Sequence, residues 1–244
     1  MYSKRVIPCL LLRGNGLIKT RKFKDPLYIG DPVNAVRIFS EKEVDEIIVL
    51  DIEASLQGRE PNYELISEIA GECFMPITYG GGINSLNHAR KLIRLGVEKV
   101  VINSAAYSSL EIISEIANVF GSQAVVAAID VKKKLIGGYK LFSNSGTKEI
   151  NVTLEDHVLG LAKSGAGELF INSIDNDGQM QGYDIDLIKK TTKIVNIPVT
   201  ICGGAGSVEH FKMAFDAGAS AAAAASLFMF YGKHKAVLIN YRRE

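Results

Sequence analysis

A glycine-rich segment occurs twice in this chain, in two stretches that align without a gap. Residues 80–104 read GGGINSLNHARKLIRLGVEKVVINS, and residues 202–226 read CGGAGSVEHFKMAFDAGASAAAAAS. A shift of 122 positions places Gly82 on Gly204 and Ser104 on Ser226. We therefore expect two homologous halves, at about residues 1–120 and 121–244. They should fold as one domain, because each half alone would leave sheet edges exposed.

Short apolar runs alternate with helical patterns along the chain, which is typical of β–α units around a parallel sheet. The runs are nearly continuous, as expected for strands buried on both faces. Eight strands are predicted, at residues 5–12, 46–51, 76–79, 99–102, 124–130, 168–172, 198–201 and 221–224. Helix starts are predicted at Asp31, Ser85, Thr153 and Ser207, whose side chains suit the N-cap position. Eight such units predict an α/β fold, a (β/α)8 barrel.

The repeated glycines follow a strand and precede a helix in both halves. Glycine allows backbone N–H groups to approach an anion closely, and the start of the helix behind it adds a favourable partial charge. One such site in each half suggests a ligand that carries a phosphate at each end.

Two connections are longer than a barrel requires. Residues 13–30 follow the first strand, are basic and contain several glycines. They are expected at the catalytic face, either as a lid or as an ordinary solvated loop, and the composition does not choose between these. Residues 132–148 follow the fifth strand and are predicted to form a small hairpin that turns at Gly137 and Gly138.

The composition argues against several classes of partner. The chain has 28 basic and 27 acidic residues, so no excess of charge indicates binding to nucleic acid or to an anionic membrane. Its longest apolar stretch has 14 residues, too few to span a membrane. Cys9, Cys73 and Cys202 lack metal-ligand spacing and are read as reduced thiols, so we expect a cytoplasmic protein without a signal peptide.

Polar residues at the carboxyl ends of barrel strands are expected to surround the active-site mouth. They are Asp51, Asn103, Asp130, Asn172, Asp175 and Asp177. Asp130 ends the apolar run AVVAAID and is interpreted as a general acid/base, with a carboxylate bound by loop N–H groups as the alternative. Asp51 is expected to orient a loop or a lysine. Lys19, in the long connection, is a candidate anion clamp or an ordinary solvated lysine.

Charged residues also occur at the starts of four predicted strands, namely Arg5, Glu46, Lys99 and Glu168. Alternating charges at these positions can form a ring across the bottom of the barrel. The residues alone favour a stabilising ion-pair plug for this ring. His88 and His210 occupy equivalent positions in the two halves and are interpreted as packing residues.

Long motifs across almost the whole chain resemble the cyclase subunit of imidazole glycerol phosphate synthase. They read KRVIPCL, GDPV, IIVLDIEAS, YGGGI, GVEKVVINSAA, FGSQAVVAAID, SGAGELFINSIDNDGQMQGYD and ICGGAGSVEHF. This resemblance implies a barrel that binds a bisphosphate substrate and receives ammonia from a glutaminase subunit docked at the N-terminal barrel face. It implies neither a metal ion nor an organic cofactor.

The resemblance also implies roles for individual residues. It assigns one phosphate to Gly82, Asn103 and Ser104, and the other to Gly204, Ala225 and Ser226. Lys19 matches the family's lid lysine, and Asp51 and Asp177 are placed with the substrate-binding residues. Arg5, Glu46, Lys99 and Glu168 match a charged gate at the ammonia entrance, which replaces the plug interpretation. Asp130 matches one of two catalytic aspartates.

The second catalytic aspartate is replaced by Leu11. General acid/base chemistry uses one group to deliver a proton and another to remove one, so a lost partner costs roughly 10²–10⁴-fold in rate. We therefore infer a divergent paralogue that passes ammonia to another acceptor, such as a surface-polysaccharide sugar amidated by a third protein. The alternatives are a working cyclase of histidine biosynthesis that relies on Asp130 alone, and a non-catalytic phosphosugar-binding regulatory subunit.

Overall fold

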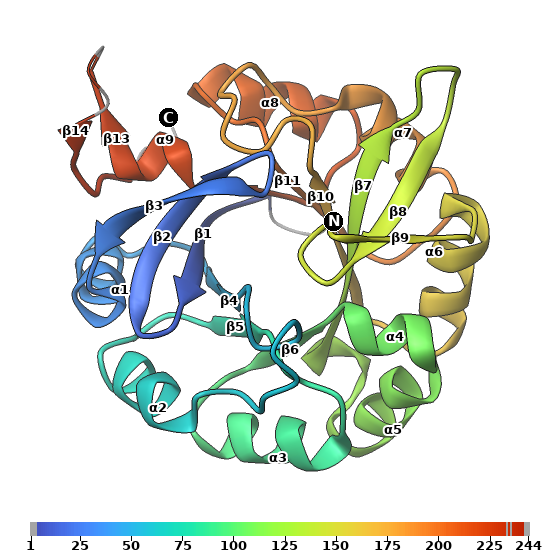
Figure 1. The fold of residues 1–244 in the computed structure, drawn as a ribbon, viewed down its shortest axis with the longest axis horizontal. Coiled ribbons are helices and arrows are strands. Elements are labelled where there is room, and N and C mark those ends of the chain that lie inside the picture. The colour runs from blue at the N-terminus through green and yellow to red at the C-terminus, as the bar shows by residue number, and fades with distance from the viewer. Residues whose placement is uncertain (1–3, 233, 235, 242–244) are drawn as a thin grey trace.

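The computed structural model describes residues 4–232, 234 and 236–241, and these form a ring of parallel strands surrounded by helices (Figure 1). The pairing of β10 with β7 closes the ring. In order around it, the strands are β1 (Arg5–Arg13), β4 (Ile47–Asp51), β5 (Ile77–Gly80), β6 (Lys99–Ile102), β7 (Val125–Lys133), β10 (Glu168–Ser173), β11 (Val199–Cys202) and β12 (Ala221–Ala224). The predicted (β/α)8 barrel is confirmed.

The predicted strands agree closely with the observed ones. Strands β6 and β12 have the predicted bounds. The largest difference is at β7, which continues to Lys133 because its end pairs with the antiparallel strand β8 (Tyr139–Ser143).

Helices follow the barrel strands and cover the outside of the ring. They are α1 (Pro32–Glu41), α2 (Tyr63–Gly71), α3 (Leu86–Arg94), α4 (Ser104–Ser108), α5 (Glu111–Phe120), α6 (Leu154–Lys163), α7 (Ile185–Thr192), α8 (Val208–Asp216) and α9 (Ser226–Met229), with a short 3-10 turn at Ser122–Ala124. Asp31, Ser85 and Thr153 each accept a hydrogen bond from a first-turn N–H, as expected of N-caps. Ser207 is also an N-cap residue, but its side chain makes no such bond.

Residues 13–30 are not an ordinary solvated loop, which corrects that alternative, and they lie at the catalytic face as expected, where Thr20 and Phe23 line one cavity and Lys19 another. They form an antiparallel hairpin of β2 (Gly16–Arg21) and β3 (Lys24–Gly30), and β2 pairs with β1. The hairpin turns at Lys22 and Phe23, both with positive φ. Four successive residues of β2 are buried, and of these Leu17 packs in the main core and Ile18 in the cluster inside the barrel.

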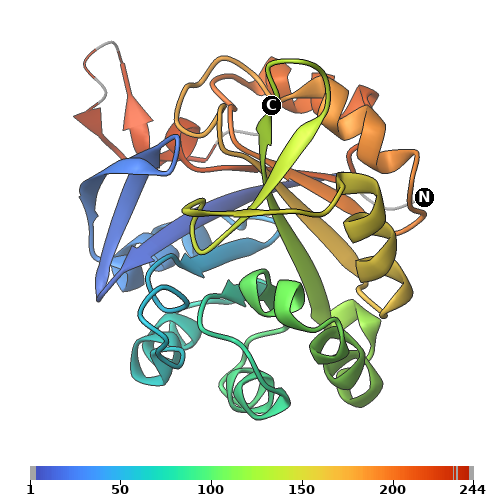
Figure 2. The ribbon, with the colours of Figure 1, turned by 45° about the vertical axis from the view of Figure 1, so that its right-hand side comes forward.

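The predicted hairpin after the fifth barrel strand is confirmed. Strand β8 pairs with the end of β7, and the Lys134 N–H donates to the Gly138 carbonyl across the turn. A third strand, β9 (Lys148–Ile150), pairs with β8. Figure 2 shows β7, β8 and β9 reaching over the barrel from the side opposite the β2–β3 hairpin.

The strands of the ring bury both of their faces. Along β1, Ile7, Cys9 and Leu11 belong to a cluster inside the barrel, whereas Leu10 and Leu12 belong to the larger core that the helices cover. This alternation places successive inward side chains along the barrel axis. Residues at the start of β1 therefore lie at the bottom of the barrel, and Leu11 lies near its mouth.

The chain continues after α9 into the short strands β13 (Phe230–Tyr231) and β14 (Ala236–Val237), which pair with each other. Within the described residues, no helix has the length and hydrophobicity needed to cross a membrane.

Candidate functional site

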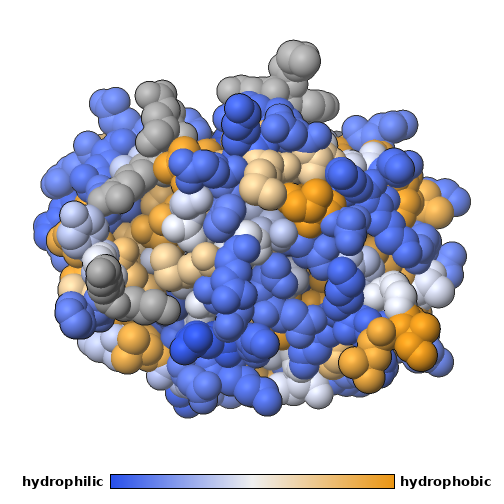
Figure 3. Space-filling model, turned by 90° about the horizontal axis from the view of Figure 1, so that it is seen from above, coloured by the Kyte–Doolittle hydropathy of each residue, from blue (hydrophilic) through white to orange (hydrophobic). Residues whose placement is uncertain are grey.

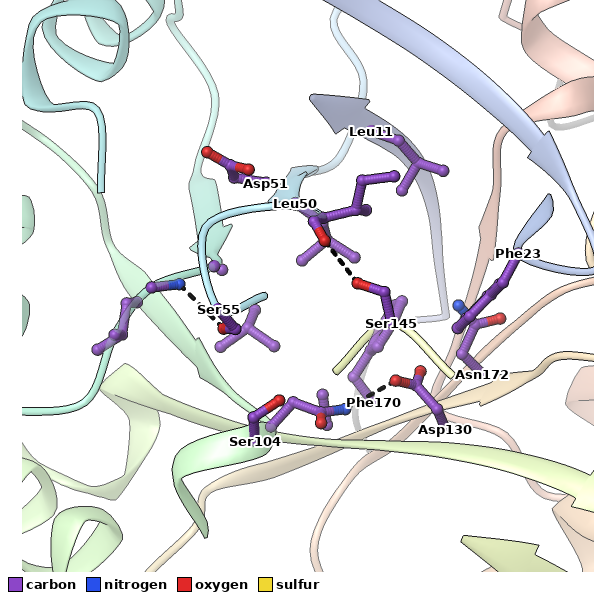
Figure 4. Close-up of a pocket in the computed structure, with 18 of the residues that line it drawn as sticks. Leu11, Phe23, Leu50, Asp51, Ser55, Ser104, Asp130, Ser145, Phe170 and Asn172 are labelled. Atoms are coloured by element: carbon purple, nitrogen blue, oxygen red, sulfur yellow. Dashed lines mark hydrogen bonds between the residues drawn. The ribbon is translucent and has the colours of Figure 1, made fainter. Parts of the chain in front are cut away.

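A cavity of about 840 Å³, including the space that is open to solvent, lies at the carboxyl ends of the barrel strands (Figure 4). Side chains from both halves of the chain line it. Among the predicted site residues, it is lined by Leu11, Asp51, Gly82, Asn103, Ser104, Asp130 and Asn172. The predicted Asp175 is not among the lining residues and instead accepts a hydrogen bond from the Lys133 N–H. We call this cavity the mouth.

Asp130 lies in the mouth as a half-buried carboxylate near the end of β7. The Asn103 amide donates a hydrogen bond of 3.0 Å to Asp130 Oδ2. Burial raises the pKa of Asp130 to about 7, although the bond from Asn103 acts in the opposite direction. A carboxyl group with such a pKa can both give and accept a proton near neutral pH, as a general acid/base must.

Leu11 also lines the mouth, with only 8% of its surface exposed. It pairs with Leu50 on one side and with Ile18 on the other. Both neighbours share its apolar cluster, in which Phe170 also lies. The position at which the resemblance implies a second carboxylate is therefore part of an apolar wall.

Asp51 is the other carboxylate that lines the mouth, but it is already bound. Its Oδ1 accepts hydrogen bonds from the backbone N–H groups of Glu53 and Ala54, and Arg59 contacts its Oδ2 at 2.8 Å. Asp51 thus fixes the loop between β4 and α2, in agreement with the loop-orienting alternative. Its partner is an arginine, which the sequence reasoning did not identify.

A second, smaller cavity of about 250 Å³ lies beside the mouth. The remaining predicted ligand residues, Lys19, Asp177, Gly204, Ala225 and Ser226, all line it. Lys19 is not a solvated lysine, because only 4% of its surface is exposed and its Nζ lies 2.5 Å from Asp177 Oδ1. The cavity therefore contains one buried ion pair between the β2–β3 hairpin and the loop after β10.

The two predicted phosphate sites have equivalent positions in the barrel. Ser104 begins α4 directly after β6, and Ser226 begins α9 directly after β12. Asn103 and Ala225 are the residues that precede these two short helices. The internal repeat is thus a repeat of structure as well as of sequence.

Glycine is required at both sites by close backbone packing. A Cβ at Gly82 would lie 2.6 Å from the Arg59 carbonyl, and one at Gly204 would lie 2.0 Å from the Gly182 carbonyl. The Gly82 N–H already donates to Ser55 Oγ at 3.3 Å. A side chain at either position would therefore push a neighbouring loop away from the barrel. The sequence did not reveal this need for glycine.

The two equivalent histidines contact these glycine loops. His88 Nδ1 lies 3.1 Å from the Gly82 carbonyl, and the Gly206 N–H donates to His210 Nδ1 at 3.1 Å. Each imidazole therefore ties a helix to the loop before it.

Sequence reasoning missed residues that cover the mouth. Phe23 lines it from the β2–β3 turn, and Ser145 lines it from the turn between β8 and β9. The Ser145 hydroxyl donates to the Ile52 carbonyl at 2.6 Å (Figure 4). These positions lie in turns, where no hydrophobic period marks a residue as part of a site.

At the opposite end of the barrel, the four predicted gate residues form one connected ring of ion pairs. Arg5 contacts both Glu46 and Glu168, and Lys99 also contacts both, at 2.9 and 3.2 Å. Thr78 donates to Glu46 at 2.6 Å, and Thr200 donates to Glu168. Burial alone would raise the pKa of Glu168, but Lys99 and Arg5 lower it below its ordinary value.

The interior between ring and mouth is apolar. It contains Ile7 and Cys9 of β1, with Val126 and Ala128 of β7 and Ala223 of β12. An ion would lose its hydration in such a lining without gaining a partner, whereas a neutral molecule would lose less. Among the described residues, no group of three or more histidine, cysteine or acidic side chains is arranged to hold a metal ion.

Comparison with known proteins gives one family. The family described as "Histidine biosynthesis protein" matches residues 5–235. A protein of Pseudomonas aeruginosa, provisionally named imidazole glycerol phosphate synthase subunit hisF2, is 54% identical over 99% of this chain and 96% of its own length. The imidazole glycerol phosphate synthase subunit HisF of Natranaerobius thermophilus is 42% identical over 100% of this chain and 97% of its own.

Proposed function

The chain belongs to the histidine biosynthesis protein family, as a relative of the cyclase subunit of imidazole glycerol phosphate synthase, and from this premise we propose a specific role. It is the ammonia-conducting subunit of a glutamine-dependent amidotransferase complex. It receives ammonia from a glutaminase at the N-terminal barrel face and passes it to an acceptor other than the imidazole precursor.

One observation carries this proposal: among the described residues, the mouth holds a single carboxylate without a basic partner, which is free to exchange protons with a ligand. Asp51 is neutralised by Arg59, and Leu11 belongs to an apolar wall. Asp130 alone remains, with Asn103 as its partner. Ring closure with one acid/base group in place of two is expected to be slower by roughly 10²–10⁴-fold.

The intact ring at the bottom of the barrel supports the conduction of ammonia. Arg5, Glu46, Lys99 and Glu168 retain a complete set of ion pairs where an entrance is needed. The names of the relatives describe them as subunits, which supports a partner chain. On this proposal the glutaminase covers the ring, and ammonia moves along the apolar interior.

The two cavities at the mouth support a phosphorylated ligand. Gly82 and Ser104 line the first cavity, and Gly204 and Ser226 line the second. On this proposal a sugar phosphate binds across them, and a third protein amidates the sugar. Phosphate or sulfate at either pair of residues in a crystal would support this ligand class.

The decisive experiment measures cyclisation of the family's bisphosphate substrate with an ammonium salt as the nitrogen source. The unmodified chain is expected to turn over far below 1 s⁻¹, the order of an ordinary enzymatic rate. Leu11→Asp is expected to raise the rate by up to roughly 10²–10⁴-fold, reduced by any misplacement of the new carboxylate. Asp130→Asn in the same variant should remove the gain.

Leu11→Asn is the matched control, because it introduces polarity without a titratable carboxylate. A gain with asparagine would show that hydration of the mouth, and not acid/base chemistry, limits the rate. Ordinary turnover by the unmodified chain would overturn the proposal and assign the chain to histidine biosynthesis.

That outcome defines the second candidate function, an active cyclase. The pKa of Asp130, about 7, favours it, because a single group titrating near neutrality can act as acid in one step and as base in another. The same assay separates the two candidates.

A further inference from the structure

The hairpin of β7 and β8 ends in two exposed aliphatic side chains. Leu135 is fully exposed, and Ile136 is 94% exposed. In Figure 1 this hairpin projects at the upper right, and Figure 3 shows hydrophobic side chains standing out at the lower right of the view from above. The tip of a surface hairpin normally carries polar turn residues, so a leucine and an isoleucine there need an explanation.

The hairpin also carries an unbalanced charge. Between residues 131 and 148 the chain has five lysines and no acidic residue, and three of the lysines directly precede Leu135. Lys140 is paired with Glu149 at 2.9 Å, so the excess positive charge lies on the three lysines nearer the tip. Of these, Lys133 approaches the exposed Asp186 at 3.6 Å, and Lys132 lies over the ring of Phe142. The tip is therefore an apolar pair beside a positively charged arm.

The arms of the hairpin are held firmly below the tip. The Lys133 N–H donates to Asp175 at 2.8 Å, and the Tyr139 hydroxyl donates to Asp184 at 3.0 Å. Leu141 and Tyr139 are buried in the main core. The backbone on both sides of the apolar pair is thus anchored, which reduces the backbone entropy that a partner would have to remove on binding.

The position of the tip relates it to the mouth. Asp130 lies on β7, which ends at Lys133, and Leu135 follows two residues later, so a span of five residues at no more than about 3.4 Å each places the tip within roughly 20 Å of the carboxylate. A protein seated on the tip would lie beside the opening of the mouth. The ion-pair ring is at the other end of the barrel, so a glutaminase there would leave the tip free.

We propose that the tip, Leu135 and Ile136 with Lys132, Lys133 and Lys134, is the docking element for the acceptor-modifying protein. This inference rests on the proposed function, because it supplies the partner that receives ammonia at the mouth. The complementary surface is an apolar pocket bordered by carboxylates. The paired apolar anchors favour a shaped protein pocket over a bilayer, because two side chains on a rigid turn bury little area in lipid.

The test starts in the producing organism, with a photo-crosslinking amino acid at position 136 of the full chain. One sugar-modifying protein should crosslink there and not from position 119, an exposed site on α5. That protein is then purified, and its affinity for the chain in complex with the glutaminase is measured. The double substitution Leu135→Ser/Ile136→Ser should weaken binding at least tenfold, and Lys134→Glu should weaken it about tenfold, more strongly at low salt.

The matched control is Val119→Ser/Met213→Ser, which removes two exposed apolar side chains from α5 and α8 and should leave the affinity unchanged. Equal binding of the tip variant and the unmodified chain would overturn the proposal. So would the same crosslinks from positions 136 and 119, or tip-dependent binding to anionic phospholipid vesicles with no protein crosslink. Stimulation of glutamine hydrolysis by the tip variant measures its interaction with the glutaminase independently. A variant that loses only the docking therefore does not contradict the proposed conduction of ammonia.

Discussion

At the scale of single residues, the chemistry of the mouth depends on which carboxylates are free. Three acidic side chains line the two cavities, and two of them are already paired, Asp51 with Arg59 and Asp177 with Lys19. Asp130 has only an amide partner. It is therefore the carboxylate on which pH should act most strongly near neutrality.

Asp130→Asn is expected to stabilise the protein at alkaline pH. The carboxyl has a pKa near 4 in the unfolded chain and about 7 in the fold, so the folded state keeps a proton that the unfolded chain releases. Stability contributed by the protonated group is therefore present below pH 4 and is lost as the pH rises to about 7 and above. Urea unfolding should give the variant an advantage of about 1–3 kcal/mol at pH 8 and almost none at pH 4.

Asp25→Asn, at an exposed position, is the control for the removal of one carboxylate from the surface. A constant difference between Asp130→Asn and the unmodified chain from pH 4 to pH 8 would mean that Asp130 ionises normally.

At the scale of elements, the β2–β3 hairpin is attached to the second half of the chain by one carboxylate. Asp177 accepts hydrogen bonds from Lys19 Nζ, from the Thr20 hydroxyl at 2.7 Å and from the Phe23 N–H at 3.2 Å. The Lys19–Asp177 pair is almost completely buried. A buried pair stabilises little as a unit, but removal of one partner leaves an uncompensated charge.

Asp177→Asn is therefore expected to lower the free energy of unfolding by about 3 kcal/mol, because the Lys19 ammonium loses its counter-charge. Hydrogen exchange should increase across residues 16–30, the segment that this contact attaches. Both effects can be measured on the isolated chain at pH 7.

Glu53→Gln provides the comparison. Glu53 pairs with Arg13, which is half exposed and lies at the end of β1, before the hairpin. Glu53→Gln should lower the free energy of unfolding by less than about 1 kcal/mol. If both substitutions lowered the free energy of unfolding equally, burial of Lys19 would not increase the cost of removing its partner.

At the scale of the whole molecule, the two halves meet along two strand pairings, β6 with β7 and β12 with β1. Ion pairs also cross the division. Glu168 contacts both Arg5 and Lys99 of the first half, and Asp177 contacts Lys19. Each half alone would lose these partners and leave two sheet edges unpaired, which favours association.

We expect chains 1–120 and 121–244, produced together, to form a stable 1:1 complex with the circular dichroism of the intact barrel. Produced alone, each should aggregate or self-associate. A division at residues 90 and 91, inside α3, is the control and should give no complex, because it breaks a helix as well as a repeat. If each half folded alone as a monomer and did not bind the other, the prediction that the half-barrels depend on each other would be wrong.

Most of the barrel could be predicted from the sequence, because strands buried on both faces are marked by continuous apolar runs. Strands β6 and β12 were predicted to the residue, and Ser85 and Thr153 cap helices as their chemistry predicts. The hairpin of β2 and β3 could not be predicted. Its segment is rich in lysine and glycine, and its strands exist because β1 extends far enough to pair with β2.

The sequence by itself determined the repeat, the eight strands and which residues stand at strand ends, because these depend on local periodicity and on chain order. Only the tertiary structure decided which carboxylates at the mouth are paired with a basic side chain. Asp51, Asp130 and Asp177 all follow barrel strands in the sequence, but in the fold Arg59 contacts Asp51 and Lys19 contacts Asp177, whereas Asp130 accepts a hydrogen bond from the neutral amide of Asn103. The reason is physical: the pKa of a carboxylate depends on burial and on charges a few ångströms away, and barrel closure brings those charges from distant parts of the chain.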